Sequence, residues 1–366
     1  MSASVPPGEP ARPSRVERAA RARRTRRGVV WGVLAALVVV MIGAFILTRV
    51  DDPSAPAGEG RADGGGSDEP AMLALQVNGG PAPFLAVVGV PTEGTPFLMP
   101  LSSELNIVVP GQGETSTAGV AALPGDSMRV ALSNMSGIWI EHFAVLTLRD
   151  LASAVDAAGG VTVDLPESYP TTGDVLGPGE VTLSGAQAKA FLAGATDDAG
   201  VRWEILLRAI LDGPSPPAVT AEVETDDVEA VNATLADAQG ADVLDMPTER
   251  VTATIIVPVY PTLDELLSGI LGTPTPVPVI VQNGSGEPGV GESVAVSILP
   301  EAFRTVLSQN AQSFDIARTE VFANGPDHAG EARAVKAALG VGRVRVAAVP
   351  SNVGDITIVV GKDFTA

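Results

Sequence analysis

FAVLTLRDLASAVDAAGGVTVDL, residues 143–165, joins a helical pattern to a strand through two glycines. The apolar side chains follow a spacing close to i, i+3, i+4 and are Phe143, Leu146, Leu151, Ala154 and Val155. This spacing predicts a helix that stops at Gly159-Gly160. The residues after the glycines, Val161–Leu165, are predicted to form a strand. The alternation of helix and strand indicates a mixed α/β domain.

Other elements are predicted on both sides of this segment. Short apolar runs bounded by Gly or Pro predict strands, and they are Met72–Val77, Phe84–Val90 and Asn106–Val109. Ser184 and Gln187 have the spacing of a capping box, which predicts a helix that begins after Ser184. A later helix is predicted from about Val201 to Leu211, before Gly213-Pro214.

Composition limits the classes of function. The chain has 366 residues, which predicts two or three domains at about 150 residues each. It carries 23 Lys and Arg against 43 Asp and Glu, and a net charge of -20 disfavours a nucleic-acid partner. The absence of cysteine excludes disulfides and thiolate metal sites. The two histidines, His142 and His328, belong to no metal-binding spacing, so neither a metal nor a cofactor is expected.

The N-terminal region has the charge pattern of a membrane anchor. Residues 1–28 hold eight arginines and two glutamates. They precede the uncharged run Val29–Leu47, whose 19 residues span about 28 Å as a helix. We therefore predict a basic cytoplasmic segment over 1–28, a single-pass transmembrane helix over 29–48 in the cytoplasmic membrane, and a flexible linker over 49–70. Everything after the helix would be extracytoplasmic; a cleaved signal peptide is the competing interpretation.

Three motifs in the following region resemble the LytR-CpsA-Psr (LCP) family of cell-envelope proteins. They are GIWIEHF at 137–143, LASAVDAAGGVTVD at 151–164 and LSGAQA at 183–188. The resemblance implies an LCP-like α/β sandwich over residues 71–272. It also implies an activity outside the membrane, in which a glycopolymer is moved from a polyprenyl-pyrophosphate carrier to peptidoglycan.

Residues 279–364 resemble a LytR C-terminal domain, after a short linker at 273–278. The motifs are VQNGSGEPG at 281–289, FDIART at 314–319 and DITIVVGKDF at 355–364. A small α/β sandwich is expected, with strands at 278–282, 303–309, 320–323, 343–349 and 355–360 and helices at 291–299 and 330–339. Gly284-x-Gly286-x-x-Gly289 superficially fits a dinucleotide fingerprint, but a tight strand-to-helix turn explains it.

The chain departs from the family pattern where charge is required. A site that transfers a group from a diphosphate requires several arginines and a cation bound by carboxylates, because negative charge builds on the leaving phosphate. The family's Ser-Asp-Thr is matched by Pro81-Ala82-Pro83, and its Ile-Pro-Arg-Asp-Thr by Met99–Ser103. Its Tyr-x-Arg-x-Arg is matched by Phe191–Ala195. Among the matched arginines, Arg202 alone is retained.

Basic residues are scarce throughout this region. Between residues 71 and 272 there are six, namely Arg129, Arg149, Lys189, Arg202, Arg208 and Arg250. We take Arg202, Arg129 and Arg149 as candidate ligand-binding residues and expect no catalytic residue; Arg202 is also expected as an ordinary surface charge. His142 is interpreted as a histidine that anchors a strand edge rather than a general base.

Three functional hypotheses remain open. The first is a non-catalytic scaffold or binding module in cell-wall glycopolymer assembly, with polyprenyl-linked glycan or peptidoglycan as partner. The second is an active glycopolymer transferase of the family's type. The third is a protein that binds through its C-terminal domain alone. That domain's cations could hold an anionic wall polymer, and they are Arg304, Arg318, Arg333, Lys336, Arg343, Arg345 and Lys362.

Overall fold

The computed structural model describes residues 70–365 except for 80–82, 158, 172, 195–201, 203–204, 207–222, 239–240, 254 and 348–352. The predicted basic segment and the apolar run Val29–Leu47 lie outside the described residues, as does most of the predicted helix 201–211. Among the helices that are described, none is long and apolar enough to cross a bilayer.

A six-stranded sheet forms the centre of the first domain. Its order is β11-β6-β1-β2-β3-β12, with β1 parallel to β6 and antiparallel to β2. The strands are β1 (Ala71–Asn78), β2 (Phe84–Val90), β3 (Phe97–Leu101), β6 (His142–Thr147), β11 (Glu224–Thr225) and β12 (Asp242–Val243). The continuous apolar runs of β1 and β2 fit central strands that are covered on both faces.

The predicted helix around Phe143 was wrong at its beginning. Phe143 and Leu146 belong to strand β6, and helix α4 (Leu148–Ala157) begins two residues after Leu146. Short apolar runs do not distinguish a buried strand from a helix by spacing alone. Pairing with β1 on one side and β11 on the other decides the conformation here.

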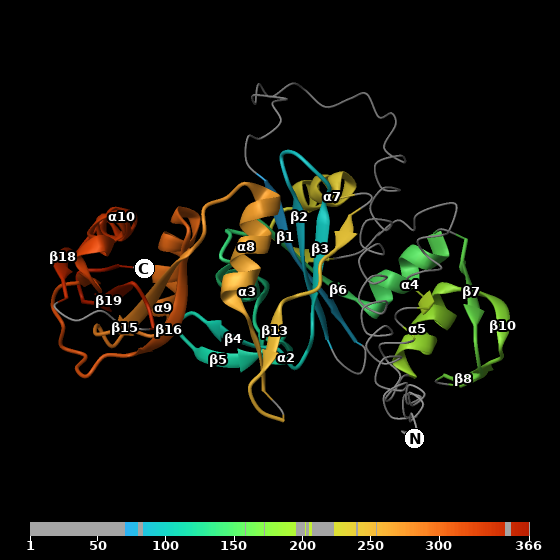
Figure 1. The fold of residues 1–366 in the computed structure, drawn as a ribbon. Coiled ribbons are helices and arrows are strands. Elements are labelled where there is room, and N and C mark those ends of the chain that lie inside the picture. The colour runs from blue at the N-terminus through green and yellow to red at the C-terminus, as the bar shows by residue number, and fades with distance from the viewer. Residues whose placement is uncertain are drawn as a thin grey trace, which may run out of the picture.

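Two layers cover the two faces of the sheet (Figure 1). Leu73 and Leu75 of β1 face a layer that includes α4, α5 (Gly185–Ala193) and α7 (Val228–Asp237). Met72 and Ala74 face the opposite layer, which includes α3 (Gly125–Ser136) and α8 (Tyr260–Leu271). The first domain is therefore a three-layer α/β sandwich.

Short elements complete this domain. They are β4 (Asn106–Val109), β5 (Gly113–Ser116), α2 (Thr117–Val120), β7 (Val161–Leu165), β8 (Tyr169–Pro170), β9 (Val175–Leu176), β10 (Gly179–Leu183), β13 (Thr248–Arg250) and β14 (Ile256–Pro258). The capping box at the start of α5 is confirmed. The Ser184 side chain accepts a hydrogen bond from the Gln187 amide, and the Gln187 side chain accepts one from the Ser184 amide.

A five-stranded sheet with two helices forms the second domain. Its order is β16-β15-β19-β17-β18. The elements are β15 (Val277–Asn283), α9 (Val290–Ile298), η2 (Leu299–Glu301), β16 (Phe303–Asn310), β17 (Glu320–Ala323), η3 (Pro326–His328), α10 (Ala329–Leu339), β18 (Arg343–Val346) and β19 (Ile356–Val360). Every predicted element of this domain is confirmed, with strand β18 shorter than expected.

The glycine pattern after β15 forms the predicted turn. Asn283 accepts hydrogen bonds through Oδ1 from the amides of Ser285 and Gly286. Gly286 and Gly289 both have φ of 80°, and Gly289 directly precedes α9. This left-handed backbone explains why glycine occupies both positions.

The two domains are joined by a buried ion pair. Nη1 of Arg304 on β16 donates to Oδ2 of Asp264 on α8 at 2.8 Å, and Nη2 donates to Oδ1. The side chain of Arg304 is 3% exposed. Asn134 of α3 reinforces the junction, because its side chain accepts from the Thr305 amide at 2.8 Å and donates to the Thr305 carbonyl at 2.9 Å.

Small residues allow the domains to approach closely. A Cβ on Gly291 would lie 2.6 Å from the Cα of Gly111, so backbone meets backbone at this contact. An apolar contact lies beside it, where Val130 and Trp139 of the first domain pack against Ala295 and Leu299 of the second. The α3 and α9 helices therefore lie side by side (Figure 1).

We expect Asp264→Ala to lower the free energy of unfolding by about 3–5 kcal/mol, because it leaves the buried Arg304 guanidinium without its carboxylate. Urea denaturation followed by fluorescence would measure the loss. The double variant Asp264→Leu/Arg304→Met should lose less, since it buries no unpaired charge. A single-variant loss below about 1 kcal/mol would show that the pair is not desolvated.

Candidate functional site

Arg202 is a buried structural residue. It is 1% exposed, so the expectation of a surface charge was wrong. Its Nη1 donates to the carbonyl oxygens of Pro170 at 2.7 Å and Phe191 at 2.8 Å. The guanidinium lies 5.3 Å from the ring centroids of both Tyr169 and Phe191.

The position of Arg202 follows from the end of helix α5. Phe191 lies in the last turn of α5, where carbonyl groups have no partner within the helix. A cation at this end also interacts favourably with the helix dipole. The rings of Tyr169 and Phe191 meet edge to face at 5.4 Å and form the apolar wall against which the arginine packs. Arg202 thus joins α5 to strand β8.

Arg129 and Arg149 have different surroundings. Arg129, on α3, pairs with Asp126 at 3.0 Å, donates to the Glu141 carbonyl at 3.1 Å, and lies 4.9 Å from the centre of the Trp139 ring. Arg149 is exposed in the first turn of α4. Arg129 and Arg202 belong to layers on opposite faces of the sheet, so the three candidate arginines do not converge on one cavity.

Uncharged residues occupy the described positions matched to the family's arginines and aspartate, and they are Leu101, Ser102 and Ala193. Leu101 lies where the family has arginine, at the end of β3, and is 2% exposed within the core. Phe191, in the segment matched to Tyr-x-Arg-x-Arg, is fully buried. In the described residues, no group of three or more histidine and carboxylate side chains is arranged to hold a metal ion.

His142 anchors a strand edge, as predicted. Its Nδ1 lies 3.0 Å from Oδ2 of Asp226, and Oδ1 of Asp226 accepts from the Phe143 amide at 3.0 Å. Burial acts to raise the pKa of Asp226. The hydrogen bonds from Phe143 and His142 outweigh that effect, so the pKa is lower than its ordinary value of 3.8. This carboxylate holds the segment before α7 against β6.

The structure divides the seven cations of the second domain into two groups. Three of them form ion pairs: Arg304 with Asp264, Arg345 with Glu320 at 2.7 Å, and Lys362 with Asp315 at 3.0 Å. Polymer binding by this domain stays a prediction, and these three cations already have a carboxylate partner. The others line a single cavity, and they are Arg318, Arg333, Lys336 and Arg343. None of these four has an ion pair within the described part of the chain.

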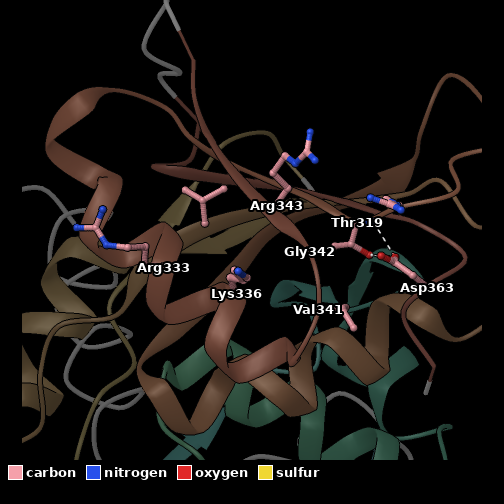
Figure 2. Close-up of a pocket in the computed structure, with 9 residues that line it drawn as sticks. Thr319, Arg333, Lys336, Val341, Gly342, Arg343 and Asp363 are labelled. Atoms are coloured by element: carbon pink, nitrogen blue, oxygen red, sulfur yellow. Dashed lines mark hydrogen bonds between the residues drawn. The ribbon is translucent and has the colours of Figure 1, made fainter.

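We call this cavity the cationic pocket; it has a volume of about 620 Å³. Arg333 and Lys336 lie one turn apart on α10, and Arg343 is the first residue of β18 (Figure 2). Arg318 lies two residues before β17. Sequence counting identified all four residues, but only their spatial partners distinguish them from the three paired cations.

One carboxylate in the lining of the pocket has a structural role. Oδ1 of Asp363 accepts hydrogen bonds from the amide and the hydroxyl of Thr319, at 2.7 and 2.8 Å (Figure 2). These bonds fix the chain beside Arg318. Asp363 is therefore already hydrogen-bonded and does not form an ion pair with any cation of the pocket.

Two family models match the chain. The LytR_cpsA_psr family model matches residues 112–200, and the model described as LytR cell envelope-related transcriptional attenuator matches residues 276–364. The chain therefore carries a LytR-CpsA-Psr segment and a LytR C-terminal domain. A comparison with curated protein sequences gave no match.

Solved structures similar to this chain include TagV of B. subtilis, at 18% identity and a TM-score of 0.45, covering 57% of this chain and 99% of TagV. TagT, also from B. subtilis and solved with bound octaprenyl pyrophosphate lipid, is 14% identical with a TM-score of 0.42, covering 56% and 91%. A transcriptional regulator from Enterococcus faecalis is 20% identical with a TM-score of 0.42, covering 57% and 89%.

We expect Arg202→Met to lower the free energy of unfolding by about 2–4 kcal/mol, because two buried carbonyl groups lose their donor. Arg149→Ala, a change at an exposed position, should alter stability by less than about 0.5 kcal/mol. Thermal or urea unfolding of both variants would measure the difference. Equal stability of the two variants would contradict a structural role for Arg202.

The lowered pKa of Asp226 makes stability depend on pH. Its ionised form stabilises the fold above the ordinary pKa of 3.8, and this stabilisation is lost as pH falls through the lower pKa of the folded state. Asp226→Asn should therefore melt at a lower temperature than the unmodified protein near pH 6, with the gap closing towards about pH 2. A gap that is constant over this range would exclude the carboxylate as its origin.

Proposed function

We propose that this LytR-CpsA-Psr protein is a membrane-anchored, extracytoplasmic protein of the cell envelope that binds cell-wall glycopolymers or their polyprenyl-linked precursors without transferring them. The arginine-rich segment 1–28 followed by the apolar run Val29–Leu47 supports anchoring with the N-terminus in the cytoplasm. The family resemblance supplies the class of partner. The chemistry of the individual residues argues for binding without transfer.

The burial of Arg202 is the observation that carries this proposal. It is the one arginine matched to the family's charged motifs, and its guanidinium is used to hold two carbonyl groups inside the first domain. A diphosphate in a transferase site needs several cations within hydrogen-bonding distance of its oxygens. Arg202 is 1% exposed and packs between the rings of Tyr169 and Phe191, so its guanidinium presents almost no surface to such a ligand.

The remaining charges of the first domain support the same conclusion. Arg129 is engaged by Asp126, the Glu141 carbonyl and the Trp139 ring, on the opposite face of the sheet from Arg202. Leu101 packs in the core where the family has arginine. A loss of charge at one position could be compensated nearby, but cations on two faces of a sheet cannot act on one phosphate.

Full-length protein in nonionic detergent, given magnesium and a glycan linked to polyprenyl pyrophosphate, should release no phosphate above a protein-free control. A family member that retains the arginine and aspartate motifs would serve as the positive control. Release that rises with protein concentration, and that disappears in an Arg202→Lys variant shown by circular dichroism to remain folded, would establish the alternative, an active glycopolymer transferase. The conservative substitution preserves the positive charge while removing the fork geometry of the guanidinium.

A further inference from the structure

We propose that the cationic pocket of the second domain binds an extended anionic polymer that carries phosphates or carboxylates on successive units. The inference rests on the proposed role as an envelope binding module, and it assigns the ligand site to Arg318, Arg333, Lys336 and Arg343. It therefore places polymer binding in the domain that does not contain the family's catalytic motifs.

The first argument is the separation of paired from unpaired cations. Outside the pocket, Arg304, Arg345 and Lys362 each have a carboxylate partner at 3.0 Å or less. Among the described cations of the second domain, the four that have no ion pair all line the same cavity. In a chain with a net charge of -20, unpaired positive charge gathered in one place provides a local field that attracts anions.

The second argument is that nearby carboxylates already have partners. Asp363 accepts two hydrogen bonds from Thr319. Glu320, which follows Thr319 in sequence, pairs with Arg345. These two carboxylates already have partners, so neither forms an ion pair with a cation of the pocket. An external anion can therefore interact with these cations once it comes within roughly 10 Å, the range over which salt screens charges.

The third argument concerns the shape of the ligand. The four cations come from three separate parts of the domain: the segment before β17, helix α10 and strand β18. In Figure 2 the side chains of Arg333 and Arg343 point in different directions and do not converge on one point. A single compact phosphate would need convergent donors. Charges spaced along an open cavity suit a polymer whose own charges are spaced along its length.

The lining also offers apolar contact. Val341 and Val344 also line the cavity and supply apolar surface for the uncharged faces of sugar or polyol units. Strand β18 is at the edge of its sheet, and the opposite edge, β16, contacts β4 of the first domain. The pocket therefore lies on the side of the second domain away from the junction (Figure 1), where a long chain can pass without meeting the first domain.

Fluorescently labelled long-chain inorganic polyphosphate is the probe for equilibrium binding to full-length protein in nonionic detergent at low salt. The pocket variant is Arg333→Ala/Lys336→Ala. The control variant is Arg345→Ala/Lys362→Ala, which removes the same charge from exposed, paired positions of the same domain. We expect the pocket variant to bind about tenfold more weakly and the control to change by less than about twofold.

Competitors identify the kind of anion. Polygalacturonate, which carries carboxylates on a sugar polymer, should displace the probe, whereas inorganic phosphate at the same total charge should not. Displacement by inorganic phosphate would overturn the proposal in favour of a compact-anion site. Displacement by anionic lipid vesicles but not by polygalacturonate would overturn it in favour of a membrane surface.

An equal loss of binding in the two double variants would also overturn the proposal, because general attraction to the domain would then explain the affinity. Circular dichroism of each variant would check that the fold is retained.

This experiment can fail independently of the proposed function. Phosphate release would refute the non-catalytic role but would leave polymer binding measurable. Absence of probe binding would refute the binding role of the pocket but would not affect the proposal that the first domain transfers nothing.

Discussion

The arrangement of the two domains depends on one buried interaction, the ion pair between Asp264 and Arg304. Each domain supplies one charge, so neither domain alone could bury its own half without a large desolvation cost. The two parallel hydrogen bonds offset that cost only when both domains are in place. The Tyr260 ring lies 4.4 Å from the guanidinium, and burial raises the pKa of its hydroxyl. Arg304 is 2% exposed and Asp264 is 8% exposed, so little of the ion pair reaches water.

The junction also determines which side of the second domain is left exposed and can present the cationic pocket to a ligand. Asn134 and the Gly111–Gly291 contact fix the second domain against α3 and β4. With β16 committed to the junction, the opposite edge strand β18 and helix α10 remain exposed. The fold therefore holds one end of the second domain against the first and leaves the cationic pocket at the other.

Arginines in the described part of the chain serve different roles, and the neighbours of each one determine its role. Arg304 joins domains, Arg202 satisfies the end of a helix, Arg129 packs on an aromatic ring, and the arginines of the pocket have no ion pair with a described residue. The roles differ because a buried guanidinium must satisfy its donors within the protein, whereas an exposed one can keep them for water or a ligand. Arg202 and Arg304 satisfy their donors within the protein, whereas the arginines of the pocket are exposed and can keep theirs for a ligand.

The amino-acid sequence alone determined the local structure of this protein. The capping box at Ser184, the glycine turn after Asn283 and the order of elements in the second domain all depend on residues within a few positions of one another. Tertiary structure decided which charges are available. Strand pairing made Phe143 part of a strand, and burial made Arg202 structural. Arg304 and its partner are 40 residues apart. No local pattern records such a partner, because burial and pairing depend on segments that meet only after the chain has folded.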